Sequence, residues 1–241
     1  TLFALLNATG YDAGPPTRRQ PFPKPRLHPV RAEVRSRLAG QDRELFRQAE
    51  AFLDAHAVPL QRYLAYTVAT AQPPFETGPK AKELQDLKGL EQLLRAAYTR
   101  WNLQELLGGL QLEYRKALKS YLGVLDAPMS RAKKLLRVQD PGAASLLVLN
   151  VLDAHDEVRV VMGEGEIVLV VGPSERPNLE GVVREYGRLF IEPIVARKAE
   201  GAWAGGAALL REAQILGARE ETVGAYATAL VSRALAFMAT E

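Results

Sequence analysis

The sequence predicts an α+β protein that is mostly helical and has one small sheet. Three observations support this class. Apolar residues recur at three- and four-residue spacing through most of the first 140 positions, which is the period of helices that bury one face. β-Branched runs of strand length follow between residues 146 and 171. Helical spacing then returns, so one short sheet is expected between two sets of helices.

Residues 1–26 form a predicted N-terminal arm. Residues 2–6 are apolar, and five prolines lie between positions 15 and 25. Proline fixes φ and has no backbone N–H to donate, so this density of prolines prevents regular structure. We expect an extended arm laid across the body, or a disordered leader. A further possibility is that residues 2–6 dock on the helices that follow.

Residues 27–139 form a predicted helical layer. Pro29 suits the first turn of a helix that Gly40 ends. Apolar stripes at helical spacing predict further helices near residues 42–57, 60–71, 84–97, 103–125 and 130–139. We expect the aromatic residues of this layer to pack in its interior.

Residues 140–241 carry the predicted sheet. β-Branched runs predict three strands, at residues 146–152, 157–162 and 166–171. Because the two segments between these runs have tight-turn sequences, we expect a small antiparallel meander.

More helices are predicted after the sheet. They cover residues 179–197, 207–216 and 220–238, with a glycine-rich linker at residues 201–206. We expect residues 140–241 to form one compact unit with the helical layer at residues 27–139.

The first of these helices carries the pattern Arg184-Glu185-Tyr186-Gly187-Arg188. This is the outline of H-E-x-x-H, in which two histidines one turn apart bind zinc and the glutamate acts on the bound water. Arginine stands at both histidine positions. A guanidinium has no lone pair for a metal and stays protonated, so we expect no zinc here. Taken alone, the pattern is also typical of a solvated helix face.

The residues around the motif extend the pattern. An aromatic residue follows Glu185, Phe190 lies two residues past the second ligand position, and Pro193 comes three residues later. The chain thus resembles a group of uncharacterised bacterial zincin-like proteins in which H-E-F-x-H-x-F-x-x-P closes the active-site helix. The resemblance includes further segments, at residues 5–12, 28–31, 73–75 and 170–174. It implies a zincin-like fold of the gluzincin type, with the sheet just before the motif helix.

The resemblance also implies roles for single residues. Glu185 corresponds to the general base and is a relic of it, while Arg184 and Arg188 occupy the relic metal positions. Without a metal, Glu185 has no activated water to work on.

The third ligand position is also a relic by this resemblance. The similar proteins have a sequence like E-x-L-V-x-R-A on a helix after the motif, and its best fit is residues 228–234. This fit puts Thr228 where a glutamate ligand is expected. Glu220 and Glu221 lie only two turns away and leave the register open.

Arg184 and Arg188 are one turn apart and share a helix face. We expect one of them to fill the vacated metal position, held there by carboxylates. Glu185 is adjacent and is expected to point elsewhere, so the predicted partners lie on later helices: Glu212, Glu220 and Glu221. Losing either arginine would then cost about 2–5 kcal/mol, as for a broken buried pair.

Composition narrows the function further. Without cysteine there is no disulfide, thiolate metal site or cysteine nucleophile. The net charge of +3 comes from 31 basic and 28 acidic residues that are interspersed. The basic run at residues 130–137 is typical of the solvent-exposed face of a helix. We therefore expect no nucleic-acid partner. No apolar run approaches the roughly 18–20 residues of a membrane span, so none is expected.

Other catalytic signals are absent from the sequence. The three histidines, His28, His56 and His155, share no ligand spacing, and we expect surface positions for them. There is no nucleophile elbow beside a histidine and no phosphate-binding loop. We therefore expect neither a metal nor another cofactor.

These observations predict a metallopeptidase-like protein that has lost its zinc ligands. It would act as a non-catalytic binding or structural module, with a peptide or protein in the former cleft. Two alternatives stay open: an active hydrolase with an unrecognised site, and a helical interaction protein unrelated to zincins. The chain begins at Thr1 without methionine, which suits a mature exported protein, periplasmic or extracellular, although a trimmed cytoplasmic protein would look the same.

Overall fold

The computed structural model describes residues 1–10, 29–38, 40–70, 73, 75, 84–138, 144–163, 165–202 and 205–241. The chain divides into two units. Unit 1 comprises Thr1–Ser120 and Ala143–Arg176, and unit 2 comprises Tyr121–Gly142 and Pro177–Glu241. The boundary predicted between residues 139 and 140 falls inside unit 2, which takes its helices from both predicted regions. The expected α+β class with mostly helical content is confirmed.

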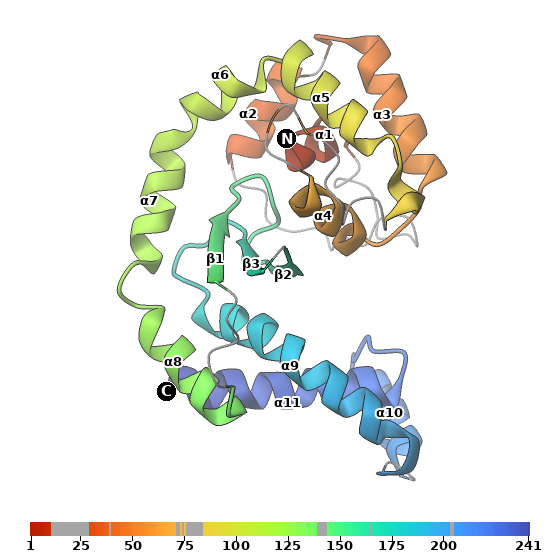
Figure 1. Cartoon of the computed structure of the whole chain (residues 1–241), viewed down its shortest axis with the longest axis vertical. Helices are drawn as coiled ribbons and strands as arrows, with labels where there is room; N and C mark the ends of the chain where they lie inside the picture. Colours follow the sequence, from red (N-terminus) through yellow and green to blue (C-terminus); the bar gives the residue numbers. More distant parts are fainter. Residues whose placement is uncertain are drawn as a thin grey trace. The chain divides into compact units, whose positions relative to one another are not determined.

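Unit 1 contains helices and a three-stranded sheet (Figure 1). Asp42 caps one helix at the predicted place, since its side chain accepts the N–H of Leu45 at 3.0 Å. The helices are α1 (Leu2–Ala8), α2 (Pro29–Leu38), α3 (Arg43–Ala55), α4 (Leu60–Ala69), α5 (Leu90–Arg100), α6 (Leu103–Gly109) and α7 (Gln111–Tyr121), with a 3₁₀ turn at Gln85–Leu87.

The first residues of the predicted arm form helix α1. Leu5 and Leu6 are buried in the core of unit 1, so an extended conformation is wrong for this part of the arm and docking is confirmed. Asn7 joins α1 to α2 through two hydrogen bonds of 2.9 Å. Its side-chain Nδ2 donates to Arg31 O, and its backbone carbonyl accepts from Arg35 Nε. The proline-rich remainder, residues 11–26, lies outside the described residues.

The helix predicted over residues 103–125 is two helices. α6 ends at Gly109 and α7 begins at Gln111. Two adjacent glycines, Gly108 and Gly109, weaken the helix at this point, because glycine loses more backbone freedom than other residues in a helix interior. The apolar spacing continues across the break, which is why it predicted a single helix.

The sheet is not an antiparallel meander. Its strands, β1 (Ala144–Leu149), β2 (Val158–Met162) and β3 (Glu166–Val171), lie in the order β1-β3-β2. β2 and β3 form the predicted hairpin, but β1 pairs with β3 in parallel. The prediction of a meander is therefore wrong at its first connection.

The connection after β1 explains the difference. It folds over the end of β3, where Asn150 N–H donates to Val171 O at 2.8 Å and Asp156 N–H to Pro173 O at 2.9 Å. Gly172 allows this fold, because a Cβ there would lie 2.0 Å from Ala154 O. The segment thus carries the chain across β3 instead of making a tight turn beside it.

Unit 2 is helical in the part that the structure describes. α9 runs without a break through Pro193, and past the predicted end at residue 197 into the predicted linker. The neighbouring helix α11 packs along α9 and runs in the opposite direction (Figure 1). The unit contains α8 (Asp126–Leu136), α9 (Leu179–Ala202), α10 (Gly206–Ile215) and α11 (Val223–Thr240).

The packing of α9 on α11 depends on a glycine. A Cβ on Gly187 would lie 2.3 Å from Leu235 Cδ2, so any other residue there would force the buried side chain of Leu235 to shift. Val183 and Ile191, one turn to either side, are buried in the same cluster as Leu235. The motif helix is therefore held by its apolar face.

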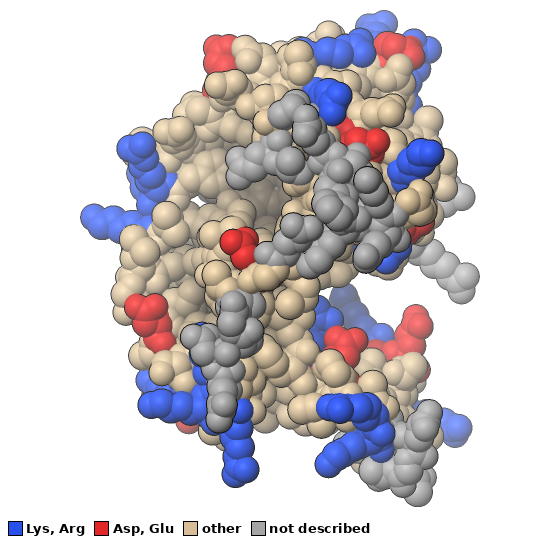
Figure 2. Space-filling view, in the orientation of Figure 1, with Lys and Arg blue, Asp and Glu red and all other residues tan. Residues whose placement is uncertain are grey.

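Among the described residues, α11 alone is long and apolar enough to cross a membrane. Its mean hydropathy is 1.3, and 33% of the 18-residue window is buried. The core helix of a soluble protein meets the same criterion. On the face drawn in Figure 2, basic and acidic side chains form several separate groups.

Candidate functional site

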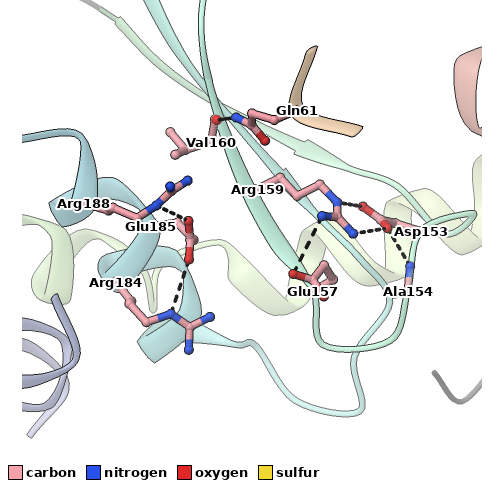
Figure 3. A network of polar contacts seen from close by, with 9 residues as sticks. All are labelled: Gln61, Asp153, Ala154, Glu157, Arg159, Val160, Arg184, Glu185 and Arg188. Atoms are coloured by element: carbon pink, nitrogen blue, oxygen red, sulfur yellow. Dashed lines mark hydrogen bonds and ion pairs between the residues drawn. The ribbon is translucent and has the colours of Figure 1, made fainter. Parts of the chain in front are cut away.

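The degenerate motif forms a self-contained charged cluster on α9 (Figure 3). Glu185 lies between the two arginines: its Oε1 is 3.4 Å from Arg184 Nε and its Oε2 is 2.9 Å from Arg188 Nε. Arg188 NH1 is also 3.7 Å from Glu192 Oε2. The side chain of Glu185 is 15% exposed, against 33% for Arg184 and 38% for Arg188. The expectation that Glu185 points elsewhere is therefore wrong.

Of the carboxylates expected from later helices, Glu220 has contacts away from the motif. Glu220 Oε2 accepts the N–H of Arg219, and Gln214 Nε2 donates to Glu220 O. Both contacts lie at the junction of α10 and α11. The ion pairs that the structure shows for the motif arginines come from α9 itself, at spacings of one to four residues.

Thr228 is not beside the motif arginines. α9 and α11 run in opposite directions, and Gly187 meets Leu235. Thr228 precedes Leu235 by seven residues, which is about 10 Å along the helix at about 1.5 Å per residue. It therefore faces the later half of α9. In the structure, buried Thr228 does not complete a three-residue relic site with Arg184 and Arg188.

This arrangement offers no metal chemistry from its own groups. The guanidiniums have no lone pair to donate, and both oxygens of Glu185 are occupied by them. Within the described residues, no three or more histidine, aspartate and glutamate side chains are grouped so that they could hold a metal ion. What the cluster does is neutralise charge on one face of α9.

The described histidines have local partners. His56 Nδ1 lies 2.8 Å from Phe52 O, and its ring stacks on Phe52 with centroids 4.0 Å apart. His155 Nδ1 lies 2.7 Å from Asp156 Oδ2. His28 lies outside the described residues.

His155 belongs to the described cluster that comes nearest to a hydrolase triad. Ser174 Oγ donates to Asp156 Oδ1, while Asp156 Oδ2 is the partner of His155. In a triad the histidine lies between the serine and the acid, because it must take the proton of the serine. Here the carboxylate lies in the middle, so this cluster does not activate Ser174 as a nucleophile.

A second arginine cluster, in unit 1, was not predicted. Arg159 makes two contacts with Asp153, Nε to Oδ2 at 3.1 Å and NH2 to Oδ1 at 3.3 Å (Figure 3). The Asp153 side chain is fully buried and also accepts the N–H of Ala154 at 2.7 Å. Arg31 is buried as well: burial lowers its pKa to about 10, and the charge of Asp153 opposes that shift.

Local sequence does not single out this cluster. Asp153 stands in a segment that suits a turn, where aspartate is common for local reasons. Its partners lie on α2 and β2, so only the folded chain shows that the carboxylate is buried. We assign the cluster a structural role, since it joins the connection after β1 to two other elements of unit 1.

The two edges of the sheet differ. On β2, Gln61 of α4 donates to Val160 O at the outer edge (Figure 3). Directly after β1, Asn150 donates its N–H to Val171 O of β3. Because backbone groups alternate along a strand, Leu147 and Leu149 direct theirs to the opposite side. The part of the chain that the structure describes contains no strand on that side.

Comparisons with protein-family models, with curated proteins and with solved structures found no significant match to this chain.

Proposed function

We propose that this chain is a non-catalytic peptide-binding module, a zincin-like relative without zinc ligands, and that an extended peptide binds along β1. The open edge of β1 is the observation that carries the proposal. A strand edge presents a row of N–H and C=O groups, and a peptide that adds as a further strand satisfies them.

The residues of β1 support this use of the edge. Natural sheets protect an open edge with charged residues, proline or a bulge. The sequence of β1, Ala-Ser-Leu-Leu-Val-Leu, has none of these, and Leu146 and Val148 are 47% and 36% exposed. An unprotected apolar edge is a site for pairing with another chain, whereas the edge of β2 is partly occupied by Gln61.

The charged cluster on α9 supports the non-catalytic part of the proposal. An active peptidase of this kind needs a metal-bound water and a free carboxylate to act on it. The side chains of Arg184 and Arg188 cannot bind the metal, and both contact the carboxylate of Glu185. The module would hold a peptide without cleaving it.

The test removes one edge donor. Leu147→Pro deletes an outward N–H and leaves the β1–β3 ladder in place, because the groups of Leu147 point away from β3. Leu147→Ala is the matched control, since it loses the side chain and keeps the N–H. The probe is a blocked, fluorescein-labelled heptapeptide of six threonines with a central leucine, and binding is followed by fluorescence anisotropy.

We expect Leu147→Pro to weaken binding about tenfold or more, because a hydrogen bond is lost and the proline ring obstructs the added strand. Leu147→Ala should bind much as the unaltered protein does. Equal binding by all three proteins would contradict the proposal. Mass spectrometry of the probe after long incubation should show no cleavage.

A further inference from the structure

A small apolar cavity lies beside the edge strand in unit 1. Its volume is about 260 Å³, and none of the described residues that line it has a charged side chain. Pockets that hold drug-sized ligands have roughly 300–1,000 Å³. This cavity therefore suits a single large side chain. Its walls include Phe3 of α1, Leu64 and Val68 of α4, Tyr114 of α7 and Val148 of β1.

The face of the sheet explains why the cavity and the edge belong together. Val148 pairs with Val170, and both line the 260 Å³ cavity together with Val168, which lies on the same face of β3. A strand added to β1 lies about 4.8 Å away and directs alternate side chains to this face. One side chain of a bound peptide therefore comes beside Val148, at the cavity.

One polar group in the cavity wall lacks a partner among the described residues. Asn150 Nδ2 is buried and donates no hydrogen bond there, while its Oδ1 accepts the N–H of Leu152 at 3.2 Å. A buried donor favours a ligand that brings an acceptor. Asn150 follows β1 directly and lines the cavity beside Val148, where the side chain of a bound peptide is expected.

We infer that the cavity takes a large apolar side chain, such as leucine or phenylalanine, of the peptide bound on β1, and that Asn150 Nδ2 donates to a backbone carbonyl of the same peptide. This inference rests on the proposed function and gives it a preference for sequence. The apolar lining without charged side chains disfavours an acidic or basic residue at this position.

The test compares three heptapeptides of six threonines in which the central residue is leucine, alanine or glutamate. Val148→Trp fills the cavity from a half-exposed position on its rim. Leu146→Trp is the matched control, because Leu146 is on the same face of β1 and similarly exposed but does not line the cavity. Circular dichroism and melting temperature verify that each variant is folded.

We expect the unaltered protein to bind the leucine peptide about tenfold more tightly than the alanine peptide, and the glutamate peptide most weakly. Val148→Trp should remove the preference for leucine, and Leu146→Trp should keep it. Asn150→Asp replaces the amide donor with an acceptor. It should weaken the binding of all three peptides about tenfold.

The outcomes separate the inference from the proposed function. If Leu147→Pro abolishes binding but Val148→Trp keeps the preference for leucine, the cavity inference is wrong and peptide binding on β1 stands. If Leu147→Pro has no effect, the proposed function fails, and the inference fails with it. Sedimentation showing self-association through β1 that no peptide displaces would assign the edge to a second copy of this chain and overturn both.

Discussion

Two clusters of arginine and carboxylate can be compared in this protein. On α9, Glu185 lies between Arg184 and Arg188, and both arginine side chains are about a third exposed. In unit 1, the side chain of Asp153 is fully buried, and that of Arg159 is 16% exposed. The first cluster is conspicuous in the sequence because its spacing resembles a catalytic motif. We expect the loss of one partner to cost more in the second cluster, because the partners that stay behind are then buried without that carboxylate.

The largest expected effect comes from the buried cluster. Asp153→Asn removes the buried negative charge that Arg159 contacts and that opposes the effect of burial on Arg31, and leaves Arg159 with the longer contact to Glu157 at 3.9 Å. We expect a loss of about 3–5 kcal/mol in the free energy of unfolding, measured by urea denaturation. The control is Asp156→Asn, three residues away and 58% exposed, which should lose less than about 1 kcal/mol. Equal losses would remove the distinction between buried and exposed carboxylates.

The next effect concerns the glycine inside the motif. Gly187→Ala places a Cβ 2.3 Å from Leu235 Cδ2. Overpacking costs about 1–3 kcal/mol, and the better helix propensity of alanine offsets up to about 1 kcal/mol of this. We therefore expect a net loss of stability, larger than that from removing either motif arginine. This result would show that the packing of α9 depends more on its apolar face than on the motif arginines.

Gly224→Ala is the control for this substitution. It lies in the first turn of α11, where an added Cβ meets nothing within 4 Å. We expect unchanged stability or a gain of a few tenths of a kcal/mol. Thermal unfolding followed by circular dichroism compares the two variants directly. A larger loss for Gly224→Ala would contradict the close packing of Gly187.

Smaller effects are expected at the motif arginines themselves. Arg184→Ala and Arg188→Ala should each cost less than about 1 kcal/mol, because exposed pairs are screened by water and salt. This replaces the sequence expectation of a buried pair. A double-mutant cycle of Arg188→Ala with Glu185→Ala, measured by urea denaturation, should give a coupling of about 0.5 kcal/mol. A loss above 2 kcal/mol for either arginine would restore the buried arrangement.

The sequence predicted elements better than their arrangement. The spacing of apolar residues placed α3 and α4 within two residues of their ends, because a helix with one buried face has a period that local sequence shows. Strand positions were also close. The parallel pairing of β1 with β3 was not predicted, because strand periodicity does not say which strand edges meet.

The charged residues show the same limit. Sequence spacing correctly put Arg184 and Arg188 on one face of α9, but their partner depends on side-chain conformation, and Glu185 turned out to be within reach of both. Asp153 could not be singled out, because its burial depends on Arg31 and Arg159 from other elements. Thr228 was assigned to the third ligand position by matching a sequence motif. Such a match does not measure distances along two packed helices.

The smallest expected effect is the return of metal binding. Arg184→His with Arg188→His restores two imidazoles one turn apart, and Glu185 loses the two guanidiniums that occupy it. A zincin site of this type needs a third protein ligand. We expect no tight zinc site, because α11 has no acidic residue between Val223 and Thr240, and Thr228 lies about 10 Å along that helix from the Gly187 contact.

Isothermal titration calorimetry with zinc measures this directly. The double variant should show at most the weak binding of a two-histidine surface site, and peptidase activity on the threonine-rich probe should stay at background. Tight, stoichiometric zinc binding by the double variant alone would contradict this expectation and would mean that a third ligand, such as Glu192 of α9, lies within reach of both imidazoles.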